Sequence, residues 1–92
     1  RLKGDRERIE RELANLHFQE LARIGHSLLG AASTAGASLL AQAANQLEAG
    51  AREMDLETVQ QAALHLFVEI DRLIASRDRI HQDLANLARK QE

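Results

Sequence analysis

The residues best suited to take part in a chemical reaction lie in one short stretch, between Ala22 and Ser33. On a helical wheel at 100° per residue, His26 falls opposite the apolar positions of this stretch, so its imidazole is expected to face water. Gly30 follows one turn later, with Ala22 and Ser33 on its flanks. A glycine inside a helix costs about 1 kcal/mol relative to alanine. The pattern predicts an imidazole that is surrounded by small side chains, so that another molecule can approach it closely.

An exposed imidazole with such small neighbours is suited to act as a nucleophile. A free imidazole has a pKa of about 6.5, so its neutral, nucleophilic form is abundant near pH 7. The sequence has no cysteine, no pair of histidines at i,i+4 and no His, Asp and Glu set with the spacing of a metal site. We therefore expect no metal and no cofactor on this chain. The other histidines lack these surroundings and are interpreted as surface or helix-end residues: His17, His65 and His81.

The composition of the chain predicts a small all-helical domain. Proline is absent, and the dominant residues Ala, Leu, Glu, Arg and Gln are good helix formers. Ninety-two residues allow one domain with a modest core, here of Leu, Ile and Ala. The net charge of −2 disfavours nucleic acid as a partner. No apolar run approaches about 20 residues, so we expect no membrane contact, and the lack of cysteine fits the cytoplasm.

Four amphipathic stretches joined by short links predict an antiparallel bundle. Gly36 suits a left-handed turn after the second stretch, and Asp55 suits the N-cap of the fourth. Short links force neighbouring helices to run antiparallel. The expected fold is an all-α, up-down-up-down four-helix bundle forming a single domain over residues 1–92. Its helices are predicted at about residues 5–14, 17–33, 37–53 and 56–90.

The four helices are expected to differ in character. The two middle ones are rich in small residues and poor in charge, so they form the inner pair, and Gly25 fits a close contact between them. The last helix has no stop signal and exceeds 30 residues, or about 45 Å, whereas the middle helices reach only about 25 Å. Residues 77–92 therefore project from the bundle. Their mixed charge favours pairing with an upstream extension of the first helix, or a homodimer through the last helix.

The central stretch resembles the signature of histidine phosphotransfer (HPt) domains. The resemblance rests on His26-Ser-Leu28-Leu-Gly30-Ala31-Ala32, then Gly36-Ala37, then a helix ending in Leu47-Glu48, and it covers about residues 16–73. HPt domains are four-helix bundles of bacterial multi-step phosphorelays, often within hybrid sensor histidine kinases. The resemblance implies that receiver domains are the partners. The Mg²⁺ ion of the reaction is then expected on the receiver domain.

The resemblance also implies a role for individual residues. His26 corresponds to the phosphorylated histidine, and Gly30 leaves room for the phosphoryl group. The family often has a lysine where this chain has Leu29, which leaves Arg23 as the local cation. Leu29 is interpreted either as an exposed receiver contact or as a residue at the edge of the core. The residues expected to dock the receiver domain are Ala22, Ser27, Leu29 and Ser33.

Two other functions remain open from the sequence. The chain is alternatively a degenerate HPt domain, or a helical docking or dimerisation module, that binds partners without carrying phosphate. The dimerising histidine domain of a sensor kinase fits less well, because Ser27 follows His26 and the chain has no proline. No segment resembles an ATP-binding site, so the domain is not expected to phosphorylate itself, and only its parent is expected to be an enzyme.

Overall fold

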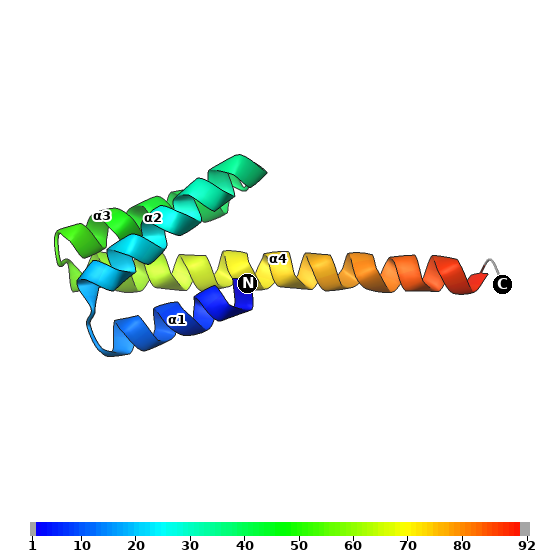
Figure 1. Cartoon of the computed structure of the whole chain (residues 1–92), viewed down its shortest axis with the longest axis horizontal. Helices are drawn as coiled ribbons and strands as arrows, with labels where there is room; N and C mark the ends of the chain where they lie inside the picture. The colour runs from blue at the N-terminus through cyan, green and yellow to red at the C-terminus, as the bar shows by residue number, and fades with distance from the viewer. Residues whose placement is uncertain (1, 91–92) are drawn as a thin grey trace.

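A computed structural model describes the backbone of residues 2–90 and the side chains of residues 4–89. It confirms the predicted all-α four-helix bundle. Consecutive helices run antiparallel, and the last helix extends far beyond the other three (Figure 1). Residues 1, 91 and 92 of the predicted domain lie outside the described residues. The helices are α1 (Leu2–Ala14), α2 (Phe18–Ala35), α3 (Ser38–Arg52) and α4 (Leu56–Lys90).

Five of the eight helix ends differ from the predicted ones, by one to three residues. The first helix begins at Leu2 rather than near residue 5, because nothing in the sequence up to Gly4 forces a stop. The second helix continues past Ser33 to Ala35, where Gly36 adopts φ 73° and donates its N–H to the carbonyl groups of the last turn. This left-handed cap ends the helix two residues later than predicted. The third helix is one residue shorter at each end.

The core of the bundle consists of aliphatic side chains alone. Over residues 4–89, no polar or charged residue is buried. Because alanine is small, the helices that carry it can approach closely, while Leu and Ile fill the remaining space. The buried core residues are Ile9, Leu21, Ile24, Leu28, Ala32, Leu40, Ala43, Ala44, Leu47, Ala51, Val59, Ala62, Ala63, Leu66 and Ile70.

Helices α2 and α3 approach each other closely at Gly25 of α2. A Cβ atom at this position would lie 2.8 Å from the backbone nitrogen of Glu48 and 2.9 Å from the carbonyl oxygen of Ala44. Real Cβ atoms do not come this close to backbone atoms, so any larger residue would push α3 away from α2. Gly25 therefore sets the spacing between the two helices at the level of its neighbour His26.

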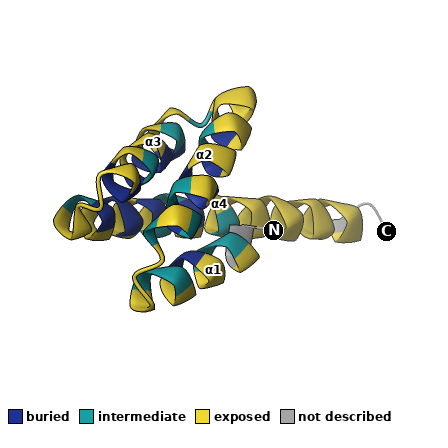
Figure 2. Ribbon diagram, turned by 60° about the vertical axis from the view of Figure 1, so that its left-hand side comes forward, coloured by how far each residue is buried: buried dark blue, intermediate teal, exposed yellow. Residues whose placement is uncertain are grey.

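The C-terminal half of α4 lies outside the bundle. Figure 1 shows that α1 and α3 pack along the first part of α4 only, with α2 next to α3, and that the rest of α4 continues alone. Its surface is exposed on all sides, as Figure 2 shows. The molecule is consequently elongated, with extents of 57 × 24 × 17 Å. Over the described residues, no helix has both the length and the apolar character that crossing a membrane requires.

Candidate functional site

The imidazole of His26 projects from the middle of α2 into solvent. Its side chain is 73% exposed, whereas Ile24 and Leu28, two residues before and after it in the chain, lie on the opposite face of the helix and are buried. Exposure follows from position, since His26 lies on the face of α2 that points away from the core. The ring is therefore accessible to a large partner without any rearrangement of the bundle.

The ring of His26 is oriented by a carboxylate on the neighbouring helix. Both carboxylate oxygens of Glu48 lie 3.2 Å from Nδ1 of His26. A carboxylate only accepts hydrogen bonds, so Nδ1 carries the proton and donates it to Glu48. In the neutral ring, the lone pair is then on Nε2. The contact thus selects one tautomer and leaves Nε2 as the nucleophilic atom on the solvent side.

Glu48 is itself held in place by a cation. Its side chain is only 12% exposed, and its Oε1 atom lies 3.1 Å from Nη2 of Arg52, one turn later on α3. The close packing at Gly25 brings the backbone of Glu48 next to α2 and so allows its short side chain to reach the ring. The result is a chain of charged and polar groups from Arg52 through Glu48 to His26, which resembles the arrangement that orients catalytic imidazoles in enzymes.

An open pocket of about 540 Å³ lies beside the imidazole. It is located at the end of the bundle where α1 joins α2 and α3 joins α4. Its apolar part includes Phe18, Ala22 and the highly exposed Met54, and its polar part includes Arg23 and Arg52. The surroundings of His26 therefore combine a mainly apolar contact surface with two positive charges, and this combination suits a protein partner that carries a phosphoryl group.

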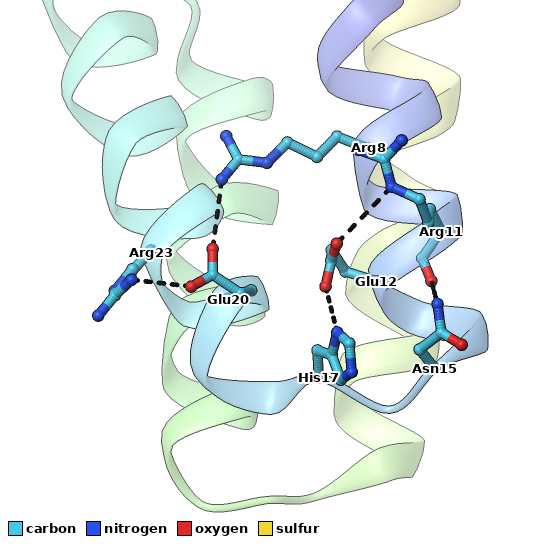
Figure 3. Close-up of polar contacts among 7 residues, drawn as sticks. All are labelled: Arg8, Arg11, Glu12, Asn15, His17, Glu20 and Arg23. Carbon is cyan, nitrogen blue, oxygen red and sulfur yellow. Dashed lines mark hydrogen bonds and ion pairs between the residues drawn. The ribbon is translucent and has the colours of Figure 1, made fainter.

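Arg23 is not the only cation near the imidazole, contrary to the expectation from sequence. Arg23 donates to Glu20 at 2.8 Å, and Glu20 also accepts from Arg8 of α1 at 3.3 Å (Figure 3). This ion pair holds Arg23 against Glu20 of its own helix, and Glu20 lies between Arg23 and Arg8 (Figure 3). Arg52, which no sequence motif indicated, is linked to His26 through Glu48 and lines the same pocket.

The structure separates the other predicted site residues into two groups. Ala22 lies in the pocket with His26, whereas Ser27 and Ser33 are exposed residues outside it. Gly30 is exposed, and a Cβ atom there would meet nothing within 4 Å, so the space next to this glycine is open, as predicted. Leu29 is half-buried and packs against the core. This agrees with the interpretation of Leu29 as a residue at the edge of the core, and its contact with a receiver domain stays a prediction.

Glu48 and Arg52 are the site residues that sequence reasoning missed. A signal was present, because they are the only charged residues of α3 between Ser38 and Arg52. Their i,i+4 spacing accounts for the ion pair, but the contact with His26 spans 22 residues and depends on how two helices pack. Over the residues that the structure describes, no three His, Asp or Glu side chains lie close enough together to hold a metal ion.

Comparison with known proteins identifies the family of the chain. The family model described as "Hpt domain" matches residues 2–90. No curated protein and no solved structure matches the chain. The match extends over the whole bundle and the projecting part of α4. The chain therefore belongs to the Hpt domain family, whose members perform histidine phosphotransfer in phosphorelays together with receiver domains.

Proposed function

We propose that His26 is the phosphoryl carrier of this domain, accepting the group from one receiver domain and passing it to a second. The observation that carries the proposal is the exposed ring, whose Nδ1 is engaged by Glu48 and whose Nε2 is free. In the forward step, the Nε2 lone pair attacks phosphorus while the bond to the receiver's aspartate oxygen breaks. The aspartate leaves as a carboxylate with the bonding electron pair, and the phosphoryl group is on Nε2.

Glu48 is proposed to assist the step through charge. After transfer, the imidazole ring keeps its Nδ1 proton and carries a positive charge, which the carboxylate of Glu48 faces at 3.2 Å. A fixed acceptor that is already in place needs no reorganisation during the reaction. Phosphoryl transfer depends mainly on positioning and on neutralising charge, so orientation of the ring is the main contribution of this domain.

Arg52 and Arg23 are proposed to provide the positive charge that the family's lysine often supplies at the position of Leu29. Both line the pocket beside His26. Each is now paired with a glutamate, and an incoming phosphoryl group offers stronger, charge-assisted hydrogen bonds to a guanidinium. Phe18 and Met54 provide the apolar contact surface for the receiver domain in this proposal.

The experiment that tests the phosphoryl carrier uses intact mass. The domain is mixed with a receiver domain charged by a small phosphodonor, and an acid-labile, alkali-stable adduct is sought. We expect the adduct on the wild type and on His65→Gln, which alters another exposed histidine, but not on His26→Gln. All three should melt alike, since neither ring is buried. An adduct on His26→Gln would place the carrier elsewhere, and tight receiver binding without any adduct would favour the degenerate docking module.

The role of Glu48 is tested with two substitutions at the same position. Glu48→Ala should slow transfer by roughly 10- to 100-fold, because the ring loses its orientation. Glu48→Gln keeps a carbonyl oxygen that accepts from Nδ1, so it should recover part of the rate. Single-turnover transfer from a charged receiver measures both. Equal rates for wild type and Glu48→Ala would show that the contact does not contribute to transfer.

A further inference from the structure

The projecting half of α4 carries an apolar stripe on one face. Ile80, Leu84 and Leu87 are 56–59% exposed, and Leu73 at the edge of the bundle is 37% exposed. Arg77 interrupts the stripe one turn before Ile80. We refer to these five residues as the α4 seam: Leu73, Arg77, Ile80, Leu84 and Leu87.

The α4 seam continues the stripe by which α4 packs in the core. Within the bundle, the stripe consists of Val59, Ala63, Leu66 and Ile70, all of them buried. Both parts follow one alternation of three- and four-residue steps, which is the heptad repeat of helices that pack side by side. The bundle supplies helices that cover the first part. Over the described residues, nothing covers the second part beyond Leu73.

Two charged residues, one in the α4 seam and one beside it, indicate which partner the seam binds. Asp83 lies on the flank of the stripe, between Ile80 and Leu84, and none of the ion pairs among residues 4–89 engages Arg77 or Asp83. We propose that the α4 seam binds the α4 seam of a second copy of this chain, antiparallel and centred on Ile80. In this register, Ile80 meets Ile80 of the second copy.

The antiparallel register makes the surface self-complementary. Leu73 lies opposite Leu87 of the second copy, and Arg77 lies beside Asp83 of the second copy. Two-fold symmetry repeats each of these contacts, so the dimer has two Arg77–Asp83 pairs. A parallel, in-register pair would instead bring the two Arg77 side chains together inside the interface, which leaves like charges facing each other.

The shape of the molecule also excludes a parallel pair. Packed helix axes lie about 8–10 Å apart, whereas the bundle gives the molecule a cross-section of 24 × 17 Å. Two bundles at the same end would therefore collide. In the antiparallel pair, the seams overlap over about 21 Å between residues 73 and 87, and the C-terminal end of each α4 reaches the near edge of the other copy's bundle.

The end of the α4 seam meets a second apolar feature of the bundle. A pocket of about 290 Å³ opens where the bundle ends, lined by Leu28, Ala32, Leu40 and Leu73 among others. Leu87 of the second copy lies next to this pocket in the antiparallel register. His26 and its pocket are near the opposite end of the bundle, with Phe18 and Met54. The dimer accordingly leaves both imidazoles free for receiver domains.

The dimer is tested by sedimentation of the full chain from low-micromolar to near-millimolar concentration. We expect the wild type to dimerise in this range. Ile80→Asp should raise the dissociation constant roughly 100-fold or more, because two unpaired carboxylates then meet in the interface. Gln82→Asp is the matched control, since it adds the same charge on the opposite face of α4 and should still dimerise. A wild type that stays monomeric, or an Ile80→Asp variant that dimerises equally well, would overturn the proposal.

The antiparallel orientation is tested by charge reversal and by crosslinking. Arg77→Glu and Asp83→Arg should each dissociate the dimer alone, and their equimolar mixture should form a heterodimer. The chain has no native cysteine, so a Leu73→Cys, Leu87→Cys double variant should oxidise to a covalent dimer, while Leu87→Cys alone should not. Oxidation of Leu87→Cys alone to a covalent dimer, or no heterodimer in the mixture, would contradict the antiparallel pair. Helicity and melting temperature serve as folding controls for every variant.

Discussion

The α2–α3 pair and the projecting half of α4 are both amphipathic, but they differ in what faces their apolar side. Between α2 and α3, small residues such as Gly25 and Ala44 bring two backbones into contact. The α4 seam consists of larger side chains, and Ile80, Leu84 and Leu87 remain more than half exposed. Amphipathic periodicity specifies a helix in both regions. Burial, and with it stability, depends on whether the same chain provides a facing helix.

The comparison also distinguishes two kinds of surface. The α2–α3 pair is closely packed at the level of His26, because no side chain at Gly25 separates the helices, and close packing suits a group that must be held in orientation. The projecting half of α4 has no such support from the residues that the structure describes. Substitutions that are identical in kind should therefore have different effects in the two regions.

The largest difference is expected for matched leucines. Leu47→Ala on α3 removes a fully buried side chain and should destabilise the bundle by about 2–5 kcal/mol. Leu84→Ala on the α4 seam should change the free energy of unfolding by less than about 0.5 kcal/mol, because that side chain is exposed. Urea denaturation at low-micromolar concentration measures both. Similar effects of the two substitutions would show that the α4 seam is covered in the monomer.

A pair of glycines on α2 should respond with opposite signs. Gly25→Ala places a methyl group against the backbone of Glu48 and should destabilise by about 1–3 kcal/mol, although alanine favours the helix. It should also slow phosphoryl transfer, since Glu48 moves away from His26. Gly30→Ala meets open space and should stabilise by up to about 1 kcal/mol. Thermal melts give the signs, and a stabilised Gly25→Ala would contradict the close packing.

A substitution at the boundary between the two regions should have an intermediate effect on the free energy of unfolding. Nη1 of Arg6 on α1 lies 2.8 Å from Oδ2 of Asp71, and Cζ of Arg6 lies 4.6 Å from the centre of the Phe67 ring. Arg6 therefore joins α1 to α4 where the bundle ends. Arg6→Ala should destabilise by about 1 kcal/mol. The control is Arg72→Ala, which removes an ion pair within α4 alone and should cost less than about 0.5 kcal/mol. Equal costs would mean that Arg6 does not help to attach α1.

The smallest expected effect concerns the start of α4, which depends on pH. Thr58 donates to the carboxylate of Asp55 from its hydroxyl at 2.8 Å and from its backbone N–H at 3.3 Å, and these hydrogen bonds lower the pKa of Asp55 below its ordinary value of 3.8. A lowered pKa in the folded state adds stability above pH 3.8, and this contribution is lost as the pH falls through the lowered value. Asp55→Ala should therefore lower the melting temperature at neutral pH and make little difference in acid. Asp55→Asn, which keeps the cap without titrating, should not show this dependence.

Much of the fold follows from local rules that the sequence carries. Periodicity placed four helices, and the cap residues Gly36 and Asp55 adopt the expected roles. The helix ends were displaced because helix propensity alone does not indicate where the first turn begins or the last turn closes. The exposure of His26 and the open space at Gly30 were also predictable, since both depend on their angle around one helix.

Contacts between helices were less predictable. Leu29 lies at the edge of the helical wheel, where either exposure or burial is possible, and the packing of the neighbouring helices placed it against the core. The interaction of His26 with Glu48 joins residues 22 positions apart on different helices. The ion pair between Glu48 and Arg52 follows from their i,i+4 spacing within α3, but only the packing of α3 against α2 connects this pair to His26.

The sequence by itself determined an all-helical chain, the family signature around His26, and an apolar stripe that runs almost the whole length of α4. These properties depend on residue type and on spacing along one helix, so they are fixed before any helices meet. The tertiary structure alone decided which part of that stripe is buried and which tautomer of His26 is held. Both outcomes depend on the distance between helices, and Gly25 makes that distance short where Glu48 reaches the imidazole.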